Sequence, residues 1–213
     1  MNYDMKSAAL ITIDVQADTL DGQPLEVPGT SASLPRIQEL AIAFREAAQP
    51  IVHVVRLYKG DGSNAEPFRR ELVSGDVPVL RPGTPGRLLA DGLLDSEDTD
   101  LDDHLLLAGG FQYFGANEAA MYKPRWGAFF GTGLEGHLRE RGVTTVVFAG
   151  CNFPNCPRTS IYQASERDFR VIVATDAVSG LYPQGEKELI GMGAYLASAS
   201  EIVASTRAPI MNA

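Results

Sequence analysis

Cys156 stands where a thiol could act as a nucleophile. It follows a β-rich run and a short turn, and Pro157 directly after it suits the first turn of a helix. A thiol at a helix N-terminus lies near the positive end of the helix dipole and near unpaired backbone N–H groups. Both effects favour the thiolate, and the N–H groups could hold an oxyanion. The alternative is a buried, inert cysteine; the strand–turn–Cys–Pro–helix context favours the nucleophile.

A nucleophilic cysteine needs a base and a group that orients the pair. Asp14 and Lys123 each end a predicted strand, at the sheet edge that would also carry Cys156. A carboxylate can accept the thiol proton, and a lysine beside both groups supplies positive charge. A histidine partner is the weaker interpretation, because none of the three ends a predicted strand: His53, His104 and His137.

These residues need an α/β framework, and the hydrophobic pattern predicts one. Apolar β-rich runs alternate with segments of helical period, which is typical of a mostly parallel sheet. The six predicted strands are Ala8–Asp14, Ile51–Leu57, Glu118–Lys123, Thr144–Ala149, Arg170–Thr175 and Glu201–Ser205. The predicted helices are Leu34–Ala48, Thr132–Arg141, Pro157–Asp168 and Lys187–Ser198. Residues 58–117 read as long loops with short helices, for instance around Glu66–Val73, and such loops often form pocket walls. Residues 1–213 form one expected domain.

Composition restricts the partners and the compartment. The chain has 213 residues, of which 45% are hydrophobic and 21% charged, and 18 basic against 27 acidic residues give a net charge of −9. Such a surface repels phosphate backbones and anionic lipid, so we expect no nucleic-acid or membrane partner. Two cysteines, Cys151 and Cys156, are too few for a disulfide scaffold. With no signal-peptide pattern at the start, we expect a cytoplasmic protein.

Three sequence blocks resemble the isochorismatase-like cysteine hydrolases, a family that includes nicotinamidases and N-carbamoylsarcosine, biuret and ureidoacrylate hydrolases. The blocks are ITIDVQ at 11–16, KPRWxAFFGTxL at 123–134 and GCNFPNCPRT at 150–159, in the family's order. The resemblance covers almost the whole chain. It implies a three-layer α/β/α, Rossmann-like fold with a mainly parallel six-stranded sheet. It also implies a catalytic triad of Asp14, Lys123 and Cys156.

The resemblance further implies a non-proline cis peptide between Cys151 and Asn152. Such a bond would direct the Asn152 N–H, together with that of Cys156, at the substrate oxygen as an oxyanion hole. Cys151 would then be a turn residue and not a second nucleophile.

Departures from the family pattern bear on the expected metal, the reaction and the shape of the pocket. Nicotinamidases carry an Asp-x-His metal cluster after the second strand, whereas this chain has VVRLYKGDGSN there, so we expect no metal and no cofactor. Members that cleave isochorismate usually lack the cysteine, and its presence here favours amide chemistry. Ala17-Asp18-Thr19 replaces the family's Asn-Asp-Phe, a change that could reshape the pocket mouth.

Several residues near the three blocks are candidates for substrate binding. The aromatic candidates could supply apolar surface, and the polar ones could orient a carboxylate or ureido group. Core packing or an ordinary surface position is the alternative for each. The candidates are Gln16, Arg125, Trp126, Phe129, Phe153 and Asn155.

We therefore expect a hydrolase that cleaves a C–N bond in a small amide, carbamoyl or ureido compound through a thioester. Two alternatives stay open: an isochorismatase-type hydrolase of a vinyl ether, and a non-catalytic small-molecule binding protein of the same fold. The resemblance also implies a homo-oligomer, a dimer or tetramer, in which a neighbour caps the pocket.

Overall fold

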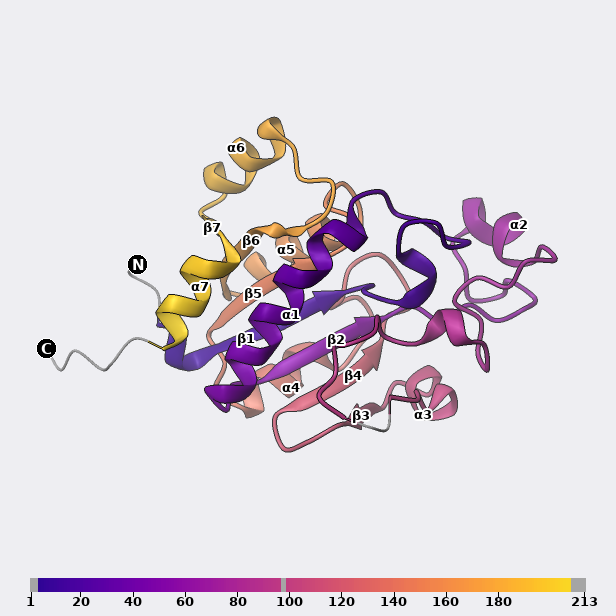
Figure 1. Cartoon of the computed structure of the whole chain (residues 1–213), viewed down its shortest axis with the longest axis horizontal. Helices are drawn as coiled ribbons and strands as arrows, with labels where there is room; N and C mark the ends of the chain where they lie inside the picture. Colours follow the sequence, from indigo (N-terminus) through magenta and orange to yellow (C-terminus); the bar gives the residue numbers. More distant parts are fainter. Residues whose placement is uncertain (1–3, 97–98, 208–213) are drawn as a thin grey trace, which may run out of the picture.

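A computed structural model describes residues 4–96 and 99–207, and a seven-stranded sheet forms its centre (Figure 1). The strand order is β3-β4-β2-β1-β5-β6-β7. Only β3 runs antiparallel to its neighbour β4, and the other paired neighbours are parallel. The strands are β1 Ala8–Ile13, β2 Ile51–Val55, β3 Phe111–Tyr113, β4 Glu118–Tyr122, β5 Thr145–Gly150, β6 Arg170–Val178 and β7 Tyr195–Ala197.

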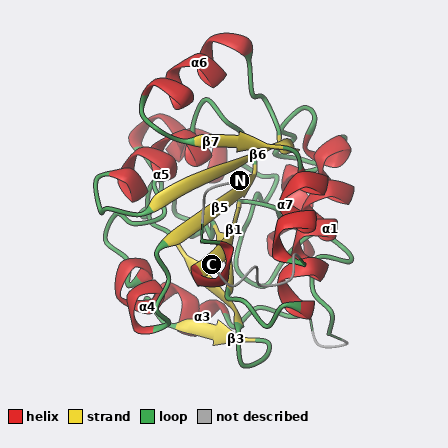
Figure 2. Cartoon of the chain, turned by 90° about the vertical axis from the view of Figure 1, so that its left-hand side faces the viewer, coloured by secondary structure: helices red, strands yellow, loops and turns green. Residues whose placement is uncertain are grey.

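Helices cover both faces of this sheet, as Figure 2 shows, and give the expected three-layer α/β/α fold. Strand β1 is buried on both sides: Ala8 and Leu10 face the core under α1 and α7, whereas Ile11 and Ile13 face the core under α4 and α5. This two-sided burial explains the nearly continuous apolar sequence of β1. The longer helices are α1 Thr30–Glu46, α4 Leu134–Glu140, α5 Cys156–Ser165, α6 Pro183–Gly191 and α7 Ala199–Thr206. None of the helices in the described ranges is long and apolar enough to span a bilayer.

The loops after β1 and β2 extend the molecule beyond the carboxyl edge of the sheet, at the right of Figure 1. A small separate core of Tyr58, Ala65, Val73, Val79 and Leu80 holds this region together. The predicted short helix around residues 66–73 is confirmed. The short elements are η1 Met5–Ser7, η2 Ala17–Thr19, η3 Pro67–Arg69, α2 Arg70–Val73, η4 Pro85–Arg87 and α3 Asp103–Leu107.

The C-terminal part of the secondary-structure prediction is wrong. Glu201–Ser205 is part of helix α7 and not a strand. Ser198 starts this helix, because its hydroxyl accepts the Glu201 N–H while the Glu201 carboxylate accepts the Ser198 N–H. The predicted helix Lys187–Ser198 ends early, at Gly191, and the last strand is β7. Strand β3 was not predicted, because its three residues show no clear alternation of polar and apolar side chains.

Gly150 is the residue that lets β5 end against β1. It pairs with Ile13, has φ +116°, and a Cβ there would overlap the Ile13 carbonyl oxygen.

We predict that Gly150→Ala lowers the free energy of unfolding by about 3 kcal/mol, the sum of backbone strain and overpacking. Gly136→Ala is the matched control, because a Cβ in α4 meets nothing within 4 Å. It should raise stability by ~0.5 kcal/mol in the same urea titration. Equal effects would contradict this account.

His137 should make stability depend on pH. Its ring stacks on Phe111 at 4.2 Å between centroids, and burial lowers its pKa to about 4 from an ordinary 6.5. The unfolded chain therefore takes up the proton first, so the free energy of unfolding falls as pH drops from about 6.5 to 4. His137→Phe should flatten that fall without abolishing it, because burial also lowers the pKa of His53.

The measurement is urea unfolding at a series of pH values. His104→Phe is the control, since His104 is exposed. An unchanged slope in His137→Phe would contradict the assignment.

Candidate active site

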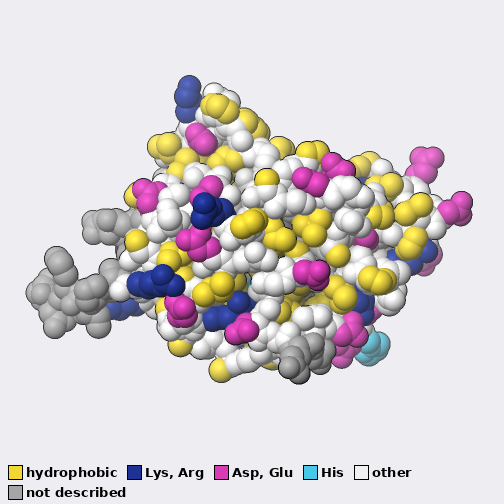
Figure 3. All heavy atoms as spheres, viewed as in Figure 1, with side chains coloured by type: hydrophobic (Ala, Val, Ile, Leu, Met, Phe, Trp, Pro, Cys, Tyr) yellow, Lys and Arg dark blue, Asp and Glu magenta, His cyan; other side chains and the backbone are white. Residues whose placement is uncertain are grey.

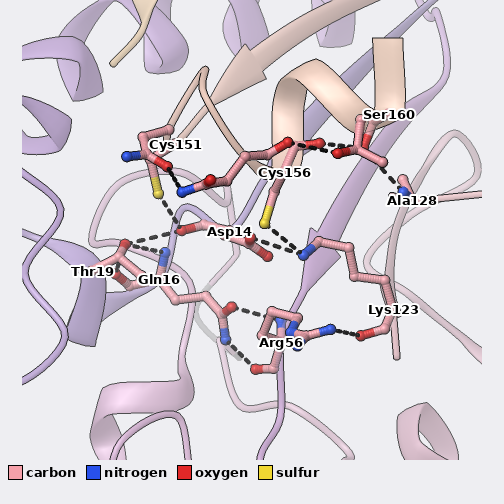
Figure 4. Close-up of polar contacts among 12 residues, drawn as sticks. Asp14, Gln16, Thr19, Arg56, Lys123, Ala128, Cys151, Cys156 and Ser160 are labelled. Atoms are coloured by element: carbon pink, nitrogen blue, oxygen red, sulfur yellow. Dashed lines mark hydrogen bonds and ion pairs between the residues drawn. The ribbon is translucent and has the colours of Figure 1, made fainter. Parts of the chain in front are cut away.

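Three residues from separate segments meet at the carboxyl edge of the sheet (Figure 4). Asp14 follows β1, Lys123 follows β4, and Cys156 is the first residue of α5. Lys123 Nζ lies 2.9 Å from Asp14 Oδ2 and 3.3 Å from Cys156 Sγ. Lys123 is fully buried, and the other two are 6% and 7% exposed. The structure thus brings together the three residues that were predicted as the triad.

Asp14 is held in a left-handed conformation, with φ 54°, that few residues other than glycine adopt. Its N–H donates to the Val54 carbonyl at 2.9 Å. Its carbonyl accepts the Thr19 hydroxyl at 2.9 Å and the Cys151 thiol at 3.1 Å. These contacts fix the backbone, so the carboxylate projects toward Lys123 and Cys156. Its Oδ1 is buried and has no hydrogen-bond partner, which leaves one oxygen able to accept a proton.

The electrostatics of Cys156 differ from the expectation of a favoured thiolate. Burial, followed by the negative charge of Asp14, raises the pKa of Cys156 to about 11, although Lys123 opposes this. The resting thiol is therefore protonated, and attack requires a base that takes the proton as the bond forms.

Cys151 is placed as a positioning residue. It is 2% exposed, and its thiol donates to the Asp14 carbonyl. Burial raises its pKa to about 12, which makes it a poor nucleophile. Both cysteines are free thiols. This placement agrees with its predicted place in the turn.

The predicted cis bond between Cys151 and Asn152 is wrong, because every peptide bond in the described ranges is trans. The trans form is lower in energy by about 3 kcal/mol. With a trans bond here, the loop still makes the backbone hydrogen bonds that hold it to the rest of the fold. Cys151 N–H donates to the Ile13 carbonyl at 2.9 Å, and Phe153 N–H donates to the Ser179 carbonyl at 2.8 Å. Among the hydrogen bonds of the described residues, the N–H groups of Asn152 and Cys156 have no protein acceptor.

A cavity of about 190 Å³ opens beside Asp14 and Cys156. It is smaller than the ~300–1,000 Å³ of pockets for drug-sized ligands, so it suits a small molecule. Asn152 and Asn155 are on its wall, as expected for an oxyanion donor and a polar substrate contact. The remaining lining residues are Thr19, Leu25, Glu26, Val27, Pro28, Arg56, Arg69, Leu80 and Cys151.

Five predicted substrate-binding residues do not line this cavity. The Gln16 amide is fully buried and bonds the backbone, donating to the carbonyls of Arg56 and Arg87. Arg125 is exposed and donates to its neighbour's carbonyl. The three aromatic residues pack against other rings: Trp126 on Phe68, Phe129 on Phe169, and Phe153 on Tyr182.

Arg56 and Arg69 are wall residues that the sequence analysis did not select. Arg56 follows β2 directly, and Arg69 lies in η3, within the region that was predicted only as loops and short helices. Arg56 lies one residue before the end of the predicted strand Ile51–Leu57, so the reasoning that selected Asp14 and Lys123 at strand ends could have found it.

His53 has a structural role away from the cavity. Its ring nitrogens hydrogen-bond Thr12 Oγ1 and Glu118 Oε1, each at 2.8 Å. Arg45 also bonds Glu118 and, with His53, offsets the burial of that carboxylate, so the pKa of Glu118 is lowered to about 2. Among the described residues, no group of three or more His, Cys, Asp or Glu side chains is placed to hold a metal ion.

The charge of Asp14 can be tested through the thiol beside it. We predict that the Cys156 thiolate, followed by its ultraviolet absorbance, forms with a pKa of about 11 in the wild-type protein. Asp14→Asn should lower this pKa, because it removes the negative charge and leaves Lys123 to stabilise the thiolate. Cys156→Ser gives the background from Cys151. A wild-type pKa below the ordinary 9 would contradict this electrostatic account.

Comparisons with known proteins place the chain in a family. The Isochorismatase domain matches residues 8–105 and 110–205. A probable inactive nicotinamidase of Arabidopsis thaliana is 32% identical over 183 residues, which cover 84% of either chain. A ureidoacrylate amidohydrolase of Methylobacterium radiotolerans is 29% identical over 191 residues, which cover 85% of this chain and 70% of the relative.

A solved structure from the same family is also similar to this chain. An isochorismatase family protein from Desulfovibrio vulgaris is 30% identical, with a TM-score of 0.78, over 92% of this chain and 96% of that one. Relatives named as amidohydrolases are consistent with a hydrolase that acts on C–N bonds. The fold, the three ordered sequence blocks and these matches agree, and the chain belongs to the isochorismatase family.

Proposed function

We propose that this protein hydrolyses the C–N bond of a small amide, carbamoyl or ureido compound through a thioester on Cys156. One observation carries the proposal: Lys123 Nζ contacts both Asp14 and Cys156, while Asp14 Oδ1 stays buried and unpartnered. A protonated thiol, an open carboxylate oxygen and a fixed ammonium group are the parts that acyl transfer from an amide requires. The amidohydrolase among the matched relatives supports the same reaction class.

The first half of the reaction forms the thioester. Cys156 Sγ attacks the substrate carbonyl carbon while Asp14 takes the thiol proton. The backbone N–H groups of Asn152 and Cys156, which have no acceptor among the described residues, hold the developing oxyanion. Asp14 then gives its proton to the nitrogen as the C–N bond breaks, and the amine or ammonia leaves.

The second half releases the acid. Water attacks the thioester carbon and gives a proton to Asp14, and the C–S bond then breaks to regenerate the cysteine. Asp14 returns the proton to the thiolate, so the net reaction is amide plus water to acid plus amine. Lys123 holds the Asp14 carboxylate in place and stabilises the transient thiolate, because its Nζ lies within 3.3 Å of both groups.

Ammonia release tests the proposal directly. Wild-type protein is assayed with a panel of small primary amides, carbamoyl compounds and ureides. Cys156→Ala and Asp14→Asn should each lower kcat/KM by about 10³-fold or more, because each removes a group that the chemistry cannot replace. His104→Gln, at an exposed position, is the control.

Other results would favour other functions. Ammonia release at the wild-type rate in Cys156→Ala would contradict the thioester route. Hydrolysis of a vinyl ether that is retained in Cys156→Ser and lost in Asp14→Asn would favour the isochorismatase-type hydrolase. Absence of ammonia with every compound would contradict the amidase and favour a binding protein.

A further inference from the structure

We propose that Leu80 limits the size of the substrate and that Asp18 is the positioning residue that holds Leu80 at the cavity. This inference rests on the proposed function, because it concerns which amides, carbamoyl compounds or ureides can reach Cys156. The class that it names is a compound with a compact side group next to the carbonyl.

The backbone of Leu80 is strained. In the described ranges, four residues other than glycine have a left-handed backbone. Ala48 and Asp168 come just after helices α1 and α5, where this conformation is common. Asp14 and Leu80, with φ 54° and 45°, follow no helix end, and both line the cavity. Such strain persists where the surrounding contacts impose it, and it is frequent at functional sites.

Two hydrogen bonds impose the conformation of Leu80. Its N–H donates to Asp18 Oδ2 at 2.6 Å, and its carbonyl accepts the Tyr58 N–H at 2.9 Å. The bond to the carboxylate is charge-assisted and therefore the stronger of the two. Leu80 is 1% exposed, and its side chain packs in the small core around Tyr58 while lining the cavity. The position of this part of the wall thus depends on the Asp18 carboxylate.

Asp18 contacts both leucines of the cavity wall. It is a buried residue of η2, in the loop that follows Asp14. Its carbonyl accepts the Leu25 N–H at 3.0 Å, while its carboxylate holds Leu80. A Cβ at Gly86 would overlap the Asp18 carboxylate, so the backbone of η4 packs closely against this group and limits its movement. One residue therefore fixes both leucines relative to the loop that carries the catalytic carboxylate.

The segment that carries Leu80 needs such an anchor, because it has little core of its own. Residues 58–80 fold around the small core, and Figure 3 shows hydrophobic side chains at the surface of this end of the molecule, at the right. Phe68, Leu72 and Val77 of this segment are 66%, 49% and 59% exposed. Few buried apolar contacts mean low local stability, so directional bonds to the rest of the fold gain importance.

Leu80 and Cys156 line the same small cavity of about 190 Å³. A molecule whose carbonyl lies at the thiol must therefore fit its side group into the space that Leu80 leaves. A bulkier group would require Leu80 to move, and its two backbone hydrogen bonds oppose that movement. Even one methylene group in an apolar pocket changes rates by about tenfold or more.

Alkylation of Cys156 tests the size limit without turnover. Rates with iodoacetamide and with the bulkier N-phenyliodoacetamide are measured at mildly alkaline pH and divided by the rates of free cysteine. Peptide mapping separates Cys156 from Cys151. The wild-type protein should discriminate against the phenyl reagent, and Leu80→Ala should reduce this discrimination about tenfold by enlarging the cavity. Leu72→Ala is the matched control, because Leu72 is an exposed leucine of the same segment and does not line the cavity.

The positioning role is tested at Asp18. Asp18→Ala should reduce the discrimination as Leu80→Ala does and leave the rate with iodoacetamide nearly unchanged. Asp18→Asn keeps an oxygen acceptor and should restore most of the discrimination. In this variant the Leu80 amide proton, followed by NMR, should move upfield, because its acceptor is neutral. Asp21→Ala is the control, at an exposed acid near Asp18 that does not line the cavity. Thermal unfolding verifies that each variant folds.

Three results would overturn the inference. They are equal normalised rates of the two reagents in the wild-type protein, undiminished discrimination in Leu80→Ala or in folded Asp18→Ala, and a Leu80 amide signal that does not move in Asp18→Asn. The last measurement decides the role of Asp18 even when Asp18→Ala does not fold. The hydrolase proposal fails separately, if the discrimination behaves as expected while wild-type protein releases no ammonia from any compact amide.

Discussion

The buried ion pair between Lys123 and Asp14 is the interaction on which the site depends. Both groups are buried, and the attraction between them offsets the several kcal/mol that removing each ion from water costs. Together they hold a carboxylate beside a thiol that burial keeps protonated. Removing either partner would leave an uncompensated charge in the interior. The pair is thus a structural requirement, and in the proposed reaction its carboxylate is the base.

The sheet makes this pair possible. Parallel β1, β4 and β5 end at one edge, so the residues that follow them converge, although Asp14 and Lys123 are 109 positions apart. Gly150 allows β5 to close on β1, and the carbonyl of Asp14 is held by Thr19 and Cys151. Strand pairing, loop hydrogen bonds and the ion pair together determine where the carboxylate points. Arg56 and Arg69, which follow β2 along the chain, also line the cavity.

The sequence was sufficient for the framework and for the three residues that meet at the edge of the sheet. Asp14, Lys123 and Cys156 each follow or begin an element with a strong pattern, and topology alone brings strand ends together. The sequence was insufficient where contacts between distant segments determine the type of an element or the direction of a side chain. Glu201–Ser205 is rich in small and apolar residues that suit either strand or helix, and the cap at Ser198 selects the helix. Gln16 and Phe153 lie in conspicuous motifs but pack inward, whereas Arg69 lies in an irregular segment whose path depends on the small core around Tyr58.

The most direct test of the account is mass spectrometry of enzyme quenched in acid during turnover of an amide, followed by peptide mapping. The account predicts an acyl group on Cys156, none on Cys151, and no adduct in Asp14→Asn, because no carboxylate is then present to take the thiol proton and pass it to the leaving nitrogen. Turnover without any adduct, or an adduct that forms equally fast in Asp14→Asn, would contradict the claim that Asp14 activates Cys156.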